Sequence, residues 1–194
     1  MAPRAVYLAK SGPASKRRHF GILIPNANCD RATLSSDYKD ITQSPTALGT
    51  IIHVVGEPLM AGFAHEFKRN FDCATDPALR ALVFLGHVDD SDVFELDQKS
   101  QIIEDVPRGA LEKLAVSVPP PPKGQDIRAL VDGVKTRRCQ EWTLEYLALL
   151  VKHGKISEDA VAIAQAERDP PSYGIFGMNE LEERSGLQST FIED

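Results

Sequence analysis

Two kinds of hydrophobic periodicity occupy different halves of this chain, and their order constrains the fold more than any other feature. Alternating or β-branched apolar runs, which are typical of strands, lie in the first half, at residues 5–10, 19–25, 49–55, 62–71 and 81–88. Helical patterns begin only after residue 106. Because the strands precede the helices instead of alternating with them, the sequence predicts an α+β fold with an antiparallel sheet packed against helices.

The segments between the apolar runs predict how the strands connect. Residues 49–55 and 62–71 are joined by a turn that contains Gly56 and Pro58, which indicates an antiparallel hairpin. The polar segment 26–48 is too long for a simple turn, and we interpret it as a functional loop or lid.

Capping signals in the second half of the chain predict four helices. Pro107 suits the first turn of the first helix, and the second is expected over residues 126–134. Thr136 and Ser157 are the expected caps of the third and fourth helices. The third helix is strongly apolar and is expected to end at Gly154.

Length and composition predict a single domain. The 194 residues, 42% hydrophobic and 26% charged, suit one α+β domain over residues 1–168, followed by a tail at 169–194 that is docked or partly mobile. The net charge of −6 argues against a nucleic-acid partner. We expect no membrane span and no secretion signal, because no apolar run is long enough. Three cysteines without C-x-x-C spacing favour free thiols and a cytoplasmic location.

Cys139 is the strongest candidate for a reactive group. It follows the expected cap Thr136 by three residues, so it falls in the first turn of the third helix, where unpaired N–H groups and the helix dipole stabilise an anion. The adjacent Arg137 and Arg138 add positive charge, and the sequence therefore predicts a lowered thiol pKa. These arginines could also hold a substrate carboxylate.

Two histidines on neighbouring predicted strands are candidates for the proton shuttle that a thiol nucleophile needs. His19 opens its strand and shares a face with Gly21, which leaves room beside the ring. His53 lies in the middle of the next strong strand and is expected to orient His19. His65 is an alternative third member. Cys29 and Cys73 lie in polar, loop-like stretches and rank below Cys139.

The motifs RRHFGILIP, GTIIHVVG and RRCQEWTLEYLALL, in this order, resemble the permuted papain-like superfamily of lecithin retinol acyltransferase and its NlpC-like relatives. The chain is also similar to small uncharacterised fungal members. The resemblance implies a circularly permuted papain-like fold. It implies His19 as the base, His53 as its orienting group and Cys139 as the nucleophile, with Trp142 at an aromatic position of the helix.

The leading hypothesis is a cysteine-dependent acyl-transfer enzyme, either an amide or ester hydrolase or an acyltransferase. It would work through a Cys139 thioester, on a small-molecule or peptide-like acyl substrate. Arg137, Arg138 and Trp142 are the candidate substrate-binding residues. No cofactor and no metal are expected, and the sequence does not define an oligomeric state.

Two other classes of function stay open at this stage. The first is a non-catalytic binding domain that keeps the papain-like fold as a scaffold, since a fold does not by itself imply an activity. The second is a metal-binding protein that uses His19, His53 and Cys139, which are ligand types that zinc accepts.

Overall fold

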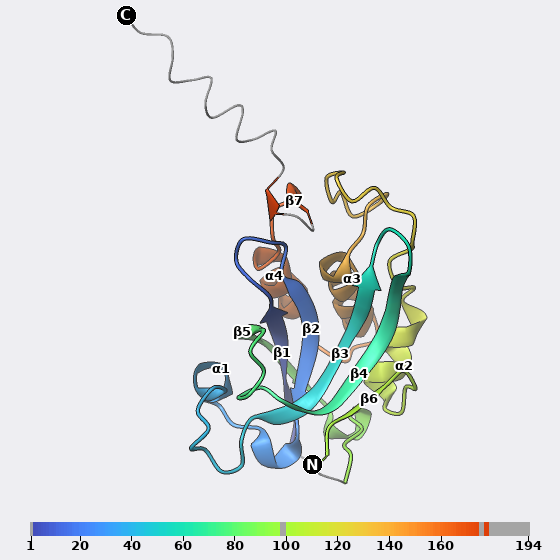
Figure 1. Cartoon of the computed structure of the whole chain (residues 1–194). Coiled ribbons are helices and arrows are strands. Elements are labelled where there is room, and N and C mark those ends of the chain that lie inside the picture. The colour runs from blue at the N-terminus through green and yellow to red at the C-terminus, as the bar shows by residue number, and fades with distance from the viewer. Residues whose placement is uncertain (1, 98–99, 175–176, 179–194) are drawn as a thin grey trace, which may run out of the picture.

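The fold was analysed in a computed structural model, which describes residues 2–97, 100–174 and 177–178. Its main sheet has six antiparallel strands in the order β5-β1-β2-β3-β4-β6 (Figure 1). The strands are β1 (Arg4–Ser11), β2 (His19–Pro25), β3 (Leu48–Glu57), β4 (Gly62–Asp72), β5 (Leu79–Val88) and β6 (Ile102–Glu104). The predicted α+β class with an antiparallel sheet is confirmed.

Four α-helices and two short 3-10 turns accompany the sheet. They are η1 (Ala27–Cys29), α1 (Leu34–Asp37), η2 (Asp90–Asp92), α2 (Ala110–Ser117), α3 (Cys139–Lys152) and α4 (Asp159–Ala166). A separate two-stranded sheet joins β7 (Tyr173–Gly174) and β8 (Gly177–Met178). None of the helices in the described part of the chain has the length and apolar character needed to cross a bilayer.

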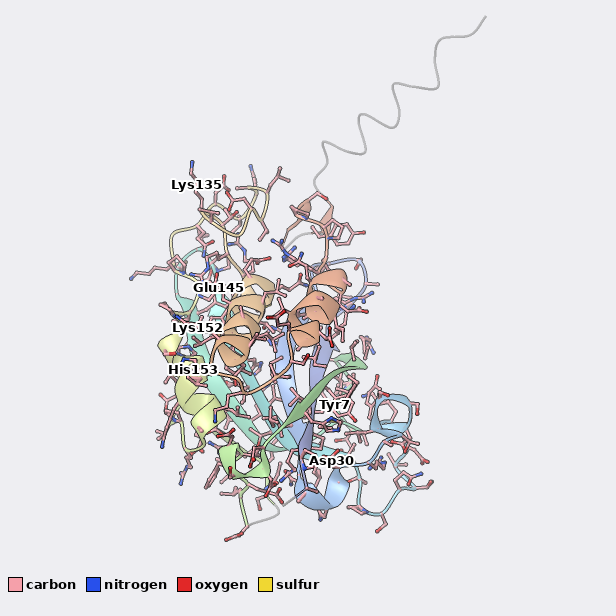
Figure 2. All side chains as sticks on the ribbon, turned by 180° about the vertical axis from the view of Figure 1, so that it is seen from behind. Tyr7, Asp30, Lys135, Glu145, Lys152 and His153 are labelled. Carbon is pink, nitrogen blue, oxygen red and sulfur yellow. The ribbon has the colours of Figure 1, made fainter. Side chains whose placement is uncertain are left out.

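Two hydrophobic clusters cover the two faces of the sheet. Helices α3 and α4 lie on one face, which is turned toward the viewer in Figure 2. Apolar side chains of the sheet, such as Phe20 and Ile52, pack there against Trp142 and Leu147 of α3. Side chains that alternate with these point to the opposite face, where α1 covers part of the sheet. In the described part of the chain, no helix covers the rest of that face (Figure 1).

The predicted hairpin between β3 and β4 is confirmed, but the expected helix over residues 126–134 is wrong. This segment forms turns and bends, and at its end the Asp132 carboxylate accepts the N–H groups of Val134, Lys135 and Thr136, which competes with helical pairing there. The segment 26–48 contains η1 and α1, and its Leu34 and Tyr38 join the second cluster.

Strands β2 and β3 separate at one end, and a cavity lies there. Within the described residues, β2 and β3 pair from Ile22–Ile52 to Pro25–Gly49. Each of the two strands pairs further with its other neighbour, β2 as far as His19 and β3 as far as Glu57. The start of β2 is therefore held by β1 and the end of β3 by β4, without backbone pairing between the two segments.

A buried ion pair fixes α2 to the sheet. Arg69 of β4 is 1% exposed, and its two Nη atoms donate to both carboxylate oxygens of Glu112 on α2 at 2.7 and 2.8 Å. The Nε of Arg69 donates to Glu104 on β6. A bidentate geometry of this kind compensates the loss of hydration that both charges suffer in the interior.

Glu112→Ala should lower the free energy of unfolding by about 3–5 kcal/mol, because it leaves the Arg69 guanidinium buried without its main partner. Urea denaturation measures the change. Glu145→Ala, which removes the more exposed partner of Arg137, is the control and should cost about 1 kcal/mol or less. Equal losses in the two variants would contradict this account of the buried pair.

Candidate active site

A cavity of about 570 Å³ opens where β2 and β3 separate. Ala9, Ile51 and Phe71, which belong to the cluster opposite α3, line part of it. His19, His53 and Cys139 also line it. The structure therefore brings the three predicted chemical groups to one cavity. No residue of segment 26–48 lines this cavity.

A chain of hydrogen bonds runs from His19 to a carboxylate. The Nε2 of His19 lies 2.7 Å from the Nδ1 of His53, and the Nε2 of His53 lies 3.0 Å from an oxygen of Glu66. We call these three residues the imidazole relay. The relay spans the gap between β2 and β3 and continues to β4, where Glu66 is the strand partner of His53.

The imidazole relay defines the tautomers of both rings. The Glu66 carboxylate can only accept, so His53 carries its proton on Nε2 and accepts at Nδ1. His19 must then donate from Nε2, which leaves its Nδ1 unprotonated. A neutral imidazole with one nitrogen committed to a donor role and the other bare is the form that a general base requires.

The surroundings of both rings favour this neutral state. Burial, followed by the charge of Lys68, lowers the pKa of His19 to about 4. Burial lowers the pKa of His53 still further, with the neighbouring His19 and Lys68 acting in the same direction. Both imidazoles are therefore uncharged at neutral pH.

Gly21 provides space for the relay, as the sequence predicted. A Cβ atom at this position would lie 3.1 Å from the Cγ2 of Ile51 and 3.3 Å from the Cβ of His53. Both contacts are tight, so a larger side chain would push against the strand that carries His53.

Cys139 is the first residue of α3, and the local cap differs from the prediction. The cap is Arg138, whose backbone N–H donates to the Glu141 carboxylate at 2.9 Å. Thr136 does not cap α3, because its hydroxyl donates to the Leu130 carbonyl and accepts from the Asp132 N–H. The cysteine therefore stands one residue beyond the cap and not three.

The sulfur of Cys139 lies against the main chain on both sides of His19. The thiol donates to the carbonyl of Arg18 at 3.9 Å, and the backbone N–H of Phe20 points to the sulfur. No imidazole is a hydrogen-bond partner of the thiol within the described residues. Cys139 is 8% exposed.

The predicted lowering of the thiol pKa is wrong. Burial raises the pKa of Cys139 to about 11, and hydrogen bonds from the N–H groups of Phe20 and Gln140 offset only part of this effect. The two other cysteines are also free and buried, and burial raises the pKa of Cys73 to about 12. At neutral pH Cys139 is thus a neutral thiol, and both imidazoles in the same cavity are neutral as well.

Arg138 lines the cavity, but the structure does not bring Arg137, Trp142 or His65 to it. Arg137 pairs with Glu145. Trp142 is fully buried, stacks on Tyr146 and donates from its indole to the Val118 carbonyl at 3.0 Å. His65 contacts the same carbonyl and the Trp142 ring, so it supports the helical layer and is not part of the relay.

Comparison with known protein families matches residues 6–157 to the family described as "Family of unknown function (DUF6540)". The chain belongs to this family. The matched segment includes all of the imidazole relay and Cys139, and it ends just before α4. No curated protein and no solved structure matches the chain. Membership of the DUF6540 family therefore brings no activity with it.

Sequence reasoning missed Glu66 and Lys68 as members of this DUF6540 site. Both alternate with His65 on β4 and share the face of His53. The register of the β3–β4 hairpin could have identified Glu66. Glu57 pairs with Gly62, and four residues further from the turn on each strand, His53 (57 − 53 = 4) pairs with Glu66 (66 − 62 = 4).

Protein stability should fall as the pH is lowered from 7 to 5. The unfolded chain binds protons at its histidines near their ordinary pKa of 6.5, whereas folded His19 binds one only near pH 4. The unfolded state thus gains protons first, and the free energy of unfolding should drop by about 2 kcal/mol for His19 over this interval.

Urea denaturation at pH 7, 6 and 5 tests this expectation. His19→Gln should remove about half of the pH dependence, because buried His53 contributes in the same direction, while His153→Gln, which removes an exposed imidazole at the end of α3, is the control. A pH dependence as steep in His19→Gln as in the unmodified chain would show that His19 does not contribute to it.

Proposed function

We propose that this protein is a cysteine-dependent acyl-transfer enzyme in which Cys139 is the nucleophile and His19 is the general base. The observation that carries the proposal is the imidazole relay, because it leaves the Nδ1 of His19 unprotonated, and His19 and Cys139 line the same cavity. A relay of this kind, which ends on a carboxylate, serves the same purpose as the third member of a catalytic triad.

The reaction begins from a neutral thiol and a neutral imidazole. His19 removes the proton of Cys139 as the sulfur attacks the carbonyl carbon, so that a bare thiolate does not build up in the buried site. The C–S bond forms, the carbonyl electrons move to oxygen, and the imidazolium is stabilised through His53 by the charge of Glu66. His19 then returns the proton to the leaving amine or alcohol, and a thioester remains on Cys139.

The start of α3 supplies donors for the oxyanion. The N–H groups in the first turn of a helix have no helical acceptor, and the helix dipole adds positive potential there. The backbone N–H of Cys139 is one such group and would bind the developing negative charge. Water then resolves the thioester in a hydrolase, and an amine or alcohol resolves it in a transferase.

The geometry also supports a finer fold proposal. A helix that begins with a cysteine is placed against a strand that begins with a histidine, and the histidine comes first in the chain. This is the arrangement expected for a circularly permuted papain-like domain. The three free thiols support a reducing compartment, and we place the enzyme in the cytoplasm.

A non-catalytic scaffold is the second candidate, and the burial of Cys139 favours it. A sulfur that donates to a backbone carbonyl and has a raised pKa is a stable resting arrangement. A metal site has less support. No group of three or more His, Cys, Asp and Glu side chains in the described ranges is arranged to hold a metal ion.

Reaction of the purified protein with 4-nitrophenyl acetate tests the enzyme proposal. We expect one acetyl group on Cys139, found by peptide mass spectrometry, together with release of 4-nitrophenolate. His19→Gln should slow this acetylation by about 10²–10⁴-fold, the usual contribution of a general base.

Cys29→Ser and Cys73→Ser are the matched controls, because both remove a buried free thiol outside the cavity lining. They should acetylate Cys139 as the unmodified chain does. Acetylation of Cys139 at the same rate in His19→Gln would support the scaffold and contradict the enzyme.

A further inference from the structure

The cavity has a strong excess of positive charge. Five cationic residues line it: Lys16, Arg17, Arg18, Lys68 and Arg138. Two acidic residues, Glu57 and Asp76, also line it.

Both acidic residues are committed to turns of the main chain. The Glu57 carboxylate accepts the backbone N–H groups of Leu59 and Met60 at 2.8 Å. The Asp76 carboxylate accepts those of Ala78 and Leu79 at 2.7 and 2.9 Å. Their charges thus stabilise local backbone structure, and no ion pair within 4.0 Å joins either to a cation in the described residues.

Arg138 is a buried cation without a carboxylate partner. It is 4% exposed, and its Nη1 donates to the side-chain oxygen of Gln125 at 2.6 Å and to the Arg137 carbonyl at 2.9 Å. Its Nη2 donates to the Asp126 carbonyl at 3.2 Å. All three acceptors are neutral, and its buried Nε has no hydrogen-bond partner in the described part of the chain. A buried guanidinium is normally paired with an anion.

The nearest carboxylate is already shared. One oxygen of Glu141 binds the guanidinium groups of Arg17 and Arg168, and the other accepts the Arg138 backbone N–H at 2.9 Å. One negative charge therefore faces three guanidinium groups, at a helix N-terminus that is itself electropositive. The Nε of Arg17 is also buried without a partner among the described residues.

Lys68 adds a cation on the face of the sheet that carries the relay. Its Nζ lies 3.5 Å from Glu66, which is longer than a direct hydrogen bond, and its side chain is 27% exposed. Its charge acts on both histidines of the relay, where it disfavours the protonated rings. The positive charge that the reaction places on His19 would thus meet repulsion from Lys68.

We propose that the cavity binds an oxyanion carried by the substrate through Arg138 and Lys68, so that the enzyme acts on acyl compounds with a carboxylate or phosphate near the scissile carbonyl. This inference rests on the proposed acyl-transfer function. The bound anion supplies the counter-charge that Arg138 lacks. It also offsets the charge of Lys68, which makes proton transfer to His19 easier once the substrate is bound.

Alkylation with iodoacetate and iodoacetamide tests the anion site without knowledge of the substrate. In both reactions the sulfur of Cys139 bonds to the CH₂ carbon, the C–I bond breaks, iodide leaves and the thiol proton passes through His19 to solvent. The reagents have nearly the same size, and only iodoacetate carries a negative charge. The ratio of the iodoacetate rate to the iodoacetamide rate therefore reports electrostatic attraction.

We expect this ratio at Cys139 to exceed the ratio at Cys29 of the same molecule by about tenfold or more. Lys68→Met and Arg138→Met should each lower the ratio at Cys139, and Lys152→Met, at the far end of α3 in Figure 2, should leave it unchanged. Lys68 is partly exposed, so its variant keeps the test valid if Arg138→Met does not fold.

Protection experiments separate the two oxyanions. Succinate should slow iodoacetamide labelling of Cys139 more than inorganic phosphate does if the site takes a carboxylate, and the reverse order assigns a phosphate. Equal ratios at Cys139 and Cys29, without protection by either anion, overturn the anion site and leave the acyl-transfer proposal standing. Failure of both reagents to label Cys139 overturns the nucleophile itself.

Discussion

The hydrogen bond between His19 and His53 joins two strands at the point where their backbone pairing has ended. Elsewhere in the sheet, backbone hydrogen bonds join neighbouring strands, and these bonds do not depend on which side chains are present. At this end the ladder is replaced by an imidazole pair, and the opening beside it admits the first residue of α3. The hydrogen bond fixes the tautomers of both rings, and the cavity lies beside it.

Burial keeps Cys139 protonated, so the site does not hold the activated thiolate that the sequence predicted. A charged sulfur is unfavourable in this interior, and so is a charged imidazole, because each would lose its hydration. In the proposed reaction, the relay would give the His19 proton a path of hydrogen bonds that ends on Glu66. The surroundings that keep both groups neutral would then make this proton transfer depend on the charge of a bound ligand.

Much of the sheet and the candidate site could be predicted from the sequence because both depend on short-range periodicity. Strand alternation predicted that His19 and Phe20 lie on opposite faces of the sheet. The helix that begins at Cys139 was visible as an apolar run with a stop at Gly154, although its cap was assigned to Thr136. The error at Thr136 arose because its hydroxyl bonds to Leu130 and Asp132 of the preceding loop. The false helix at 126–134 ends in a turn whose N–H groups bond to the Asp132 carboxylate.

Other features of the site depend on tertiary contacts that no local pattern contains. Burial raises the pKa of Cys139, whereas the sequence showed only the nearby cations, which would lower it. Trp142 was predicted beside the substrate because the resemblance implies an aromatic residue at this helix position, but the side chain is buried in the cluster between α3 and the sheet. Glu66 differs from these cases, since the hairpin register already aligned it with His53.

Asp169 connects the segment after α4 to the candidate site. Its carboxylate accepts the backbone N–H of Arg18 and the side-chain amide of Gln140, both at 2.7 Å, which ties it to the residues that precede His19 and follow Cys139. Asp169 thus lies beside the cavity, whereas β1 begins at the opposite end of the molecule (Figure 1). A fluorophore placed just after this anchor would sense events at the cysteine, and an affinity tag before Arg4 would stand well clear of them.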